Sequence, residues 1–101
     1  MSPIAELILQ ARSATGDSFE LRVEIGVPRS VTDDEWLCPL SIVPLQQYRT
    51  LTDTRGTSAF QALSLAIDYV RLSLDAFVAE GGELRLEGQM FAVDCLRLKG
   101  I

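Results

Sequence analysis

The side chains able to do chemistry in this chain are carboxylates, arginines, tyrosines and two cysteines, because the sequence contains no histidine. Histidine is the commonest general acid-base group near neutral pH and a frequent zinc ligand. Cys38 and Cys95 form no CxxC pair and have no histidine to complete a zinc or thiol-catalytic set. We therefore predict no catalytic residue, no metal site and no cofactor, and we expect that the protein is not an enzyme.

Three consecutive acidic residues, Asp33, Asp34 and Glu35, end the segment 28–35, which its proline and small hydroxyl residues mark as a loop. A divalent metal needs several converging oxygen ligands, and adjacent residues seldom all point inward. A solvated acidic loop explains the run without a metal. Such a loop also presents carboxylates to a basic protein partner and accelerates association with it by electrostatic steering.

A second polar group, Arg55, Thr57 and Ser58, stands with Asp53 at the start of a predicted helix. Backbone N–H groups and the helix dipole can hold an anion at such a place. Helix capping explains the same residues without any ligand. A small-ligand-binding domain with an anion site here is therefore the less favoured of the alternatives.

The charge and hydropathy of the chain disfavour two classes of partner. The net charge is −5, and the basic residues are scattered among acids without forming a basic helix or patch, so we predict no nucleic-acid partner. No apolar run approaches the roughly 20 residues that span a bilayer, and the N-terminal segment lacks the pattern of a secretion signal. We therefore expect a cytoplasmic protein with no membrane contact.

The elements that must position these residues centre on one long helix in residues 57–82 of the 101-residue chain, which we treat as a single domain, 1–101. Ser58 and Gln61 have the spacing of a capping box, and Gly81-Gly82 provides a left-handed stop. Residues 4–12 and 19–27 alternate apolar and polar side chains and predict two strands joined by the loop 13–18.

Three weaker strands complete the predicted fold. Residues 36–47 suit an irregular strand whose Pro39 and Pro44 belong at an edge or a bulge. After the helix, residues 83–87 and 90–96 suit two more strands with a tight turn at Glu87-Gly88. The result is an α+β fold in which one long helix packs on one face of an antiparallel sheet of four to five strands, in the order β-β-β-α-β-β.

Winding the helix at 100° per residue separates its side chains into three strips. The strip expected to cover the sheet consists of Phe60, Leu63, Ile67, Val70, Leu74 and Phe77, and the polar strip of Gln61, Ser64, Asp68, Arg71 and Asp75. A third strip, Leu65, Tyr69 and Leu72 with Ala76, is apolar and lies beyond the sheet-facing arc. Either the preceding loop or residues 95–101 cover this strip within one chain, or it contacts a second copy or a different protein.

The two cysteines leave two interpretations open. Both lie in apolar, strand-like contexts and suit buried reduced thiols, since free cysteine behaves as a small hydrophobe. A disulfide between Cys38 and Cys95 is the other interpretation.

Residues from about Phe19 to Gly88 combine a proline-bearing third strand, the helix TSAFQALSLAIDYVRLSL and the following GGELRLEG. This layout resembles a group of small bacterial domains of unknown function, some of which are suspected to neutralise toxins. The resemblance implies a binding role.

Our leading hypothesis is thus a small cytoplasmic protein-binding domain of the immunity type, which neutralises a toxin with a basic surface by direct contact. Its contact residues would be Asp33, Asp34, Glu35, Leu65, Tyr69 and Leu72. A homodimeric structural or regulatory module, with the apolar strip as its seam, is the main alternative.

Overall fold

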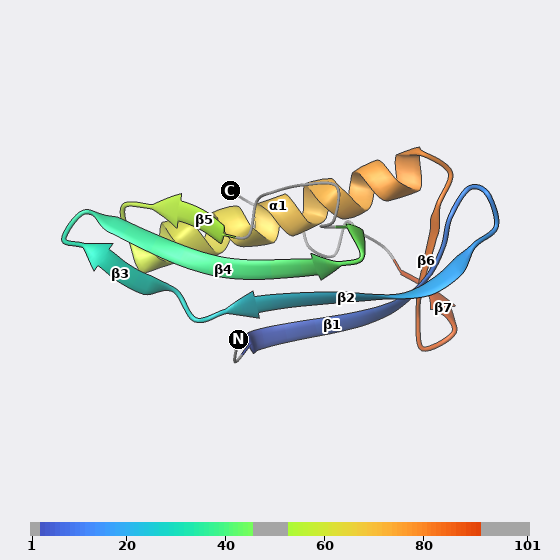
Figure 1. The fold of residues 1–101 in the computed structure, drawn as a ribbon, viewed down its shortest axis with the longest axis horizontal. Coiled ribbons are helices and arrows are strands. Elements are labelled where there is room, and N and C mark those ends of the chain that lie inside the picture. The colour runs from blue at the N-terminus through green and yellow to red at the C-terminus, as the bar shows by residue number, and fades with distance from the viewer. Residues whose placement is uncertain (1–2, 46–52, 92–101) are drawn as a thin grey trace.

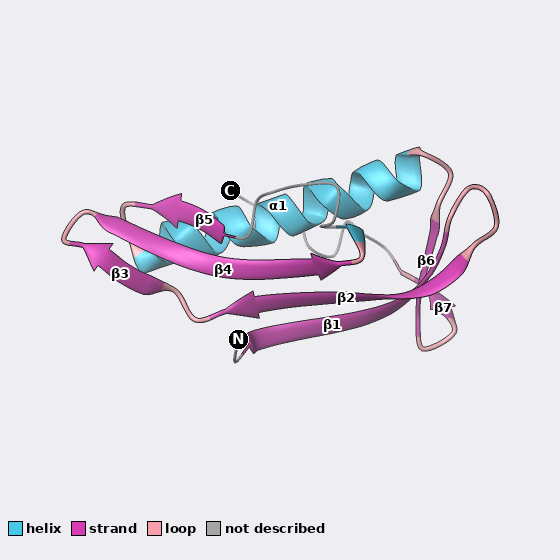
Figure 2. Cartoon of the chain, in the orientation of Figure 1, coloured by secondary structure: helices cyan, strands magenta, loops and turns pink. Residues whose placement is uncertain are grey.

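A computed structural model describes residues 3–45 and 53–91, which form one helix packed on one face of an antiparallel sheet (Figures 1 and 2). The predicted α+β class is confirmed. The predicted count of four to five strands is wrong, because the described residues contribute seven strands to the sheet. Five of these precede the helix and two follow it. The elements are β1 (Pro3–Arg12), β2 (Ser18–Gly26), β3 (Arg29–Thr32), β4 (Glu35–Val43), β5 (Asp53–Gly56), α1 (Ala59–Ala79), β6 (Glu83–Leu86) and β7 (Gln89–Met90).

The first two strands form the hairpin that their alternation predicts. Leu9 lies opposite Leu21, and both side chains are fully buried beneath the helix layer. In the loop between the two strands, the Ser13 N–H donates to the Asp17 carbonyl at 2.8 Å, and Gly16 has a positive φ of 95°. The predicted second strand is shifted by one residue, since β2 starts at Ser18 and Val27, which is 57% exposed, lies beyond its end.

The segment 28–35, expected as a loop, instead contains β3, a turn at Asp33-Asp34 and the first residue of β4. Its burial does not alternate, because all four residues of β3 are exposed. The strand exists through its pairing with β4, in which Arg29 lies opposite Leu37. The short polar strand β5 was missed for the same reason, because only Thr54 within it is buried.

Among the described residues, strand β4 pairs with three different strands along its length. On one side it pairs with β3 through Glu35–Leu37 and with β2 through Leu40–Val43, and on the other with β5. Pro39 has a described partner on one side only, Asp53 of β5, which is an arrangement that a residue without an N–H allows. The strand ends at Val43, before the cis Val43–Pro44 peptide bond, so the predicted end at residue 47 is not reached.

Both ends of α1 follow the predicted capping chemistry. The Gln61 N–H donates to Ser58 Oγ at 3.1 Å, and Gln61 Oε1 accepts from the Thr57 N–H at 2.6 Å. At the other end Gly82 N donates to the Phe77 carbonyl and Gly81 N to the Val78 carbonyl, each at 3.0 Å, with Gly81 at φ 100°. These two bonds form a Schellman motif, which ends the helix after Ala79.

The sheet-facing strip of the helix was predicted incorrectly at one end, since Phe60 is 78% exposed. The buried side of the helix is rotated by roughly 60° from the predicted sheet-facing side, on a wheel of 100° per residue. Small residues therefore lie where the helix contacts the sheet most closely. Its buried residues are Ala62, Ala66, Val70, Ser73 and Leu74. Small side chains let the backbones approach, and a Cβ built on Gly56 would lie 2.8 Å from the Ala62 nitrogen.

The core lies between α1 and one face of the strands β1, β2, β4 and β6. Cys38 is fully buried there as a free thiol, with Sγ 3.6 Å from the Gly26 carbonyl, and burial raises its pKa. The free thiol of Cys38 agrees with the interpretation as a buried reduced cysteine and not with the alternative disulfide; Cys95 lies outside the described residues. The β6–β7 turn is confirmed, because Glu87 and Gly88 have φ values of 52° and 83°; residues 92–96 of the last predicted strand are not among those described.

Candidate protein-binding surface

The apolar strip of α1 lies on the flank of the helix that borders β5. Leu65 is 42% exposed and Leu72 is 52% exposed, while Tyr69 between them is half-buried. These three side chains and Asp68 line one side of a shallow groove of about 480 Å³, and Asp53, Thr54 and Arg55 of β5 line the other. The structure thus brings the apolar strip of the helix next to β5, which contains Asp53 and Arg55 of the polar group noted in the sequence. We call this surface the flank groove.

Thr54 anchors β5 beside the helix. Its hydroxyl is buried and donates to the Ala62 carbonyl at 2.7 Å. Because side chains alternate along a strand, Asp53 and Arg55 project to the opposite face of the sheet from Thr54. Arg55 Nη1 lies 2.8 Å from Glu35 Oε1 on β4, and Arg55 Nε lies 3.7 Å from Asp53 Oδ1.

These contacts separate the members of the two polar groups suggested by the sequence, the acidic run 33–35 and the group at the start of the helix. Glu35 is the first residue of β4, and its side chain forms an ion pair with Arg55 of β5, so it is separated from the two acids of the turn. Thr57 and Ser58 both bond Gln61, in the capping arrangement. The structure therefore does not converge Arg55, Thr57 and Ser58 on one anion, and helix capping accounts for the last two.

The remaining acids, Asp33 and Asp34, form the turn at the tip of the β3–β4 hairpin. Both are exposed, and neither carboxylate has an ion-pair partner among the residues that the structure describes. The Asp34 N–H donates to Thr32 Oγ1 at 3.4 Å. The tip lies outside the flank groove. The six predicted contact residues are therefore divided: three line the groove, two form the tip, and Glu35 pairs with Arg55.

A charged border runs along the other side of the apolar strip. Arg71 lies between Asp68 and Asp75, with nitrogen–oxygen distances of 2.6 and 3.2 Å. The hydrogen bond to Asp68 raises the pKa of Arg71 above its usual value. The flank groove therefore passes directly from an apolar to a charged surface, which is the arrangement of an interface core and its rim.

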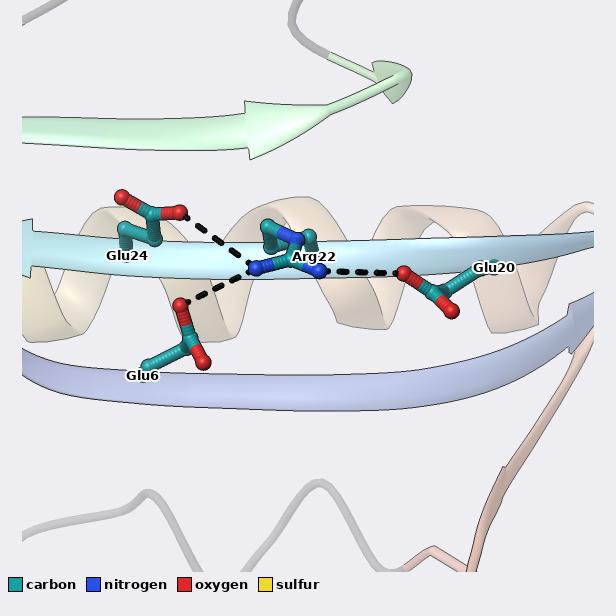
Figure 3. A network of polar contacts seen from close by, with 4 residues as sticks. All are labelled: Glu6, Glu20, Arg22 and Glu24. Carbon is teal, nitrogen blue, oxygen red and sulfur yellow. Dashed lines mark hydrogen bonds and ion pairs between the residues drawn. The ribbon is translucent and has the colours of Figure 1, made fainter.

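The sheet face away from the helix carries a charged network on β1 and β2. There Arg22 lies among three carboxylates, Glu6 at 3.2 Å, Glu20 at 3.4 Å and Glu24 at 3.9 Å (Figure 3). Exposed ion pairs of this kind contribute only about 0–1 kcal/mol each, so the network mainly keeps this face hydrated. Within residues 3–45 and 53–91, no group of three or more potential ligands is placed to hold a metal ion. In the same residues, no helix is both long and apolar enough to cross a membrane.

The sequence analysis named Arg55 and mentioned Asp53 but missed their arrangement around Thr54. The signal was present, because an acid and a base separated by one residue share a face of any strand. It could be recognised only once the segment 53–56 was known to be a strand. Polar four-residue strands lack the apolar alternation that identifies longer ones.

Comparison with known proteins places the chain in a family. Neither the curated proteins nor the solved structures gave a match. A family model described as "Domain of unknown function (DUF6968)" matches residues 6–93. That range covers β2 to β7 and most of β1, so it includes the flank groove and the hairpin tip. The chain belongs to this family, DUF6968.

Proposed function

We propose that this protein is a protein-binding domain that acts by contact and without catalysis, and that the flank groove is its main contact surface. The observation that carries the proposal is the exposure of Leu65 and Leu72, 42% and 52%, on a helix flank that opens onto an edge strand. Full burial of one leucine side chain is worth about 1.5–3 kcal/mol. Two leucines beside a tyrosine therefore offer substantial binding energy to a chain that covers them.

The hairpin tip supports a second, weaker contact. Asp33 and Asp34 present two exposed carboxylates on a turn, and the whole chain has a net charge of −5. A basic protein surface would be attracted to this tip before short-range contacts form. We propose a toxin with a basic surface as the heterologous partner, held in the cytoplasm by an immunity-type contact, and we assign the tip to that role.

Site-specific photo-crosslinking tests the main proposal. A photoreactive residue at position 72 should form a covalent adduct with another protein chain in the native host. The same residue at position 60 is the matched control, because Phe60 is on the same helix and 78% exposed but does not line the groove. Adducts at 72 and not at 60 support the proposal. A position-72 crosslink only within the same chain would show that the chain covers its own groove.

The toxin role has a separate test. Co-expression with a toxin encoded by a neighbouring gene should restore growth, and Asp33→Lys with Asp34→Lys should weaken the protection. Lysine at both positions reverses the charge of an exposed turn without touching the core. No protection by the wild-type chain against any such toxin would reject this role and leave the flank groove unaffected.

A further inference from the structure

Strand β5 has one edge paired with β4, and its other edge borders the flank groove. Its register with β4 is regular, from Trp36 opposite Gly56 to Pro39 opposite Asp53. Among residues 3–45 and 53–91, no strand pairs with the second edge. An edge strand directs the N–H and C=O groups of alternate residues away from its partner, so it is a template for another strand.

We propose that a second copy of this chain occupies the flank groove, with the two β5 strands paired antiparallel about a two-fold axis at Thr54. This inference rests on the proposed function, because it names the chain that covers the same surface. The sheet then continues from β4 and β5 of one copy into β5 and β4 of the other.

The charges of β5 favour a second copy as the occupant and a register centred on Thr54. Antiparallel pairing centred on Thr54 places Asp53 opposite Arg55 of the second copy, and Arg55 opposite its Asp53. Centring on either charged residue would instead oppose like charges, which destabilises a strand pair, while opposite charges and Thr–Thr pairs stabilise it. The Arg55 side chain is 59% exposed despite its contact with Glu35, so its guanidinium can reach across the new pair.

The helix position fits the same arrangement. Helix α1 contacts both β4 and β5, and a two-fold axis perpendicular to the sheet would place both helices on the same face. Neighbouring strands are roughly 4.8 Å apart, so two helices that each lie over a β4–β5 pair would be separated by roughly two strand spacings, about 10 Å. Packed helices lie about 8–10 Å apart.

The apolar strip then meets its own copy. Leu65 and Leu72 lie on the flank of α1 that borders the second edge of β5, and this is the flank that would face the other helix. Such an interface is isologous, because the same patch serves both copies. It combines main-chain hydrogen bonds between strands with apolar contact between helices.

A charge-swap experiment tests the register. Asp53→Arg alone and Arg55→Asp alone each oppose like charges at both pairs, so each variant should dissociate at least tenfold more readily than the wild type in sedimentation or light scattering. The double variant Asp53→Arg, Arg55→Asp restores both pairs and should dimerise. An equimolar mixture of the two single variants also restores both pairs and should form a heterodimer. A folding role through the Asp53–Arg55 contact within one chain predicts rescue by the double variant but not by the mixture, so the mixture is the decisive measurement.

Leu72→Asp and Phe60→Asp provide a second readout that does not depend on the ion pairs. Leu72→Asp should give a folded monomer by circular dichroism and light scattering, whereas Phe60→Asp should remain dimeric. Single charge variants that stay dimeric, or a mixture that stays monomeric, would overturn the Thr54-centred register.

The position-72 crosslink separates failure of this inference from failure of the proposed function. A monomeric wild type whose position 72 crosslinks to a different protein rejects the second copy but retains protein binding. A monomeric wild type with no intermolecular crosslink rejects both.

Discussion

The strands β3 and β5 make the most instructive comparison in this molecule. Each has four residues, and the two pair with opposite sides of the first half of β4 (Figure 1). In β3 the register shifts between Ser30 and Thr32, so Val31 is an extra, bulged residue. The Ser30 hydroxyl also donates to the Thr32 carbonyl at 2.9 Å. In β5 the register is regular and a buried threonine holds the strand to the helix.

Within residues 3–45 and 53–91, only one of these two edges keeps the regular row of backbone groups that another strand needs. A bulge and a side chain bonded to a backbone carbonyl both disturb the row of groups that another strand would need, and native sheets use such features to prevent association. Strand β5 lacks a bulge and adjoins exposed leucines. The regular register of this short polar edge is the reason why we propose it as a contact surface.

Gly56→Ala should lower the free energy of unfolding more than any other substitution considered for β3 and β5, because β5 depends on close approach to the helix. The new Cβ would lie 2.8 Å from the Ala62 nitrogen and 2.9 Å from Gln61 Cβ. Overpacking of this kind costs about 2 kcal/mol, and chemical denaturation would measure it. Gly16→Ala is a useful contrast, because the space around its Cβ is open and only the positive φ of 95° penalises it. Equal losses in the two variants would contradict steric locking of β5.

Thr54→Val should have the next largest effect on stability. It keeps the shape of the side chain but removes the hydroxyl that donates to the Ala62 carbonyl from a buried position. A hydrogen bond of this kind contributes about 1 kcal/mol net, which lowers the Tm of a domain of this size by about 4–8 °C. An unchanged Tm in calorimetry would show that the helix holds β5 by apolar contact alone.

Ser58→Ala tests whether the start of α1 supports the β5 side of the sheet. The variant removes the side chain that accepts from the Gln61 N–H, and loss of an N-cap costs about 1 kcal/mol. Amide exchange in β5 and in the first turn of α1 should accelerate together, while exchange in β3 should not change. Faster exchange in β3 as well would mean that both edges depend on the same local structure.

Ser30→Ala should have the smallest effect on stability, because its hydrogen bond to Thr32 is exposed. Surface substitutions of this kind usually change stability by less than about 0.5 kcal/mol. The oligomeric state should also stay the same, since the bulge at Val31 remains. Stronger self-association of this variant, measured by sedimentation, would show that the serine hydroxyl is the main protection of the β3 edge.

The parts of the fold that were predictable carry their information locally. The caps at Ser58 and Gly81, the alternation in β1 and β2, and the Glu87-Gly88 turn each depend on residues a few positions apart. The strands β3 and β5 were not predictable, because their residues are mostly exposed and their pairing partner lies elsewhere in the chain. The apolar strip at Leu65 and Leu72 was identified from the wheel, but what lies beside it was not.

By itself the sequence determined the α+β class, the long capped helix and the existence of an apolar strip that the sheet does not need, because periodicity and capping are properties of neighbouring residues. Only the tertiary structure decided the rotation of α1, which places Ala62 and Ala66 against the sheet and leaves Phe60 exposed. It also placed the strip beside β5 and paired Glu35 with Arg55. Those outcomes depend on how closely two backbones can approach and on which strands become neighbours, and neither is encoded in local spacing.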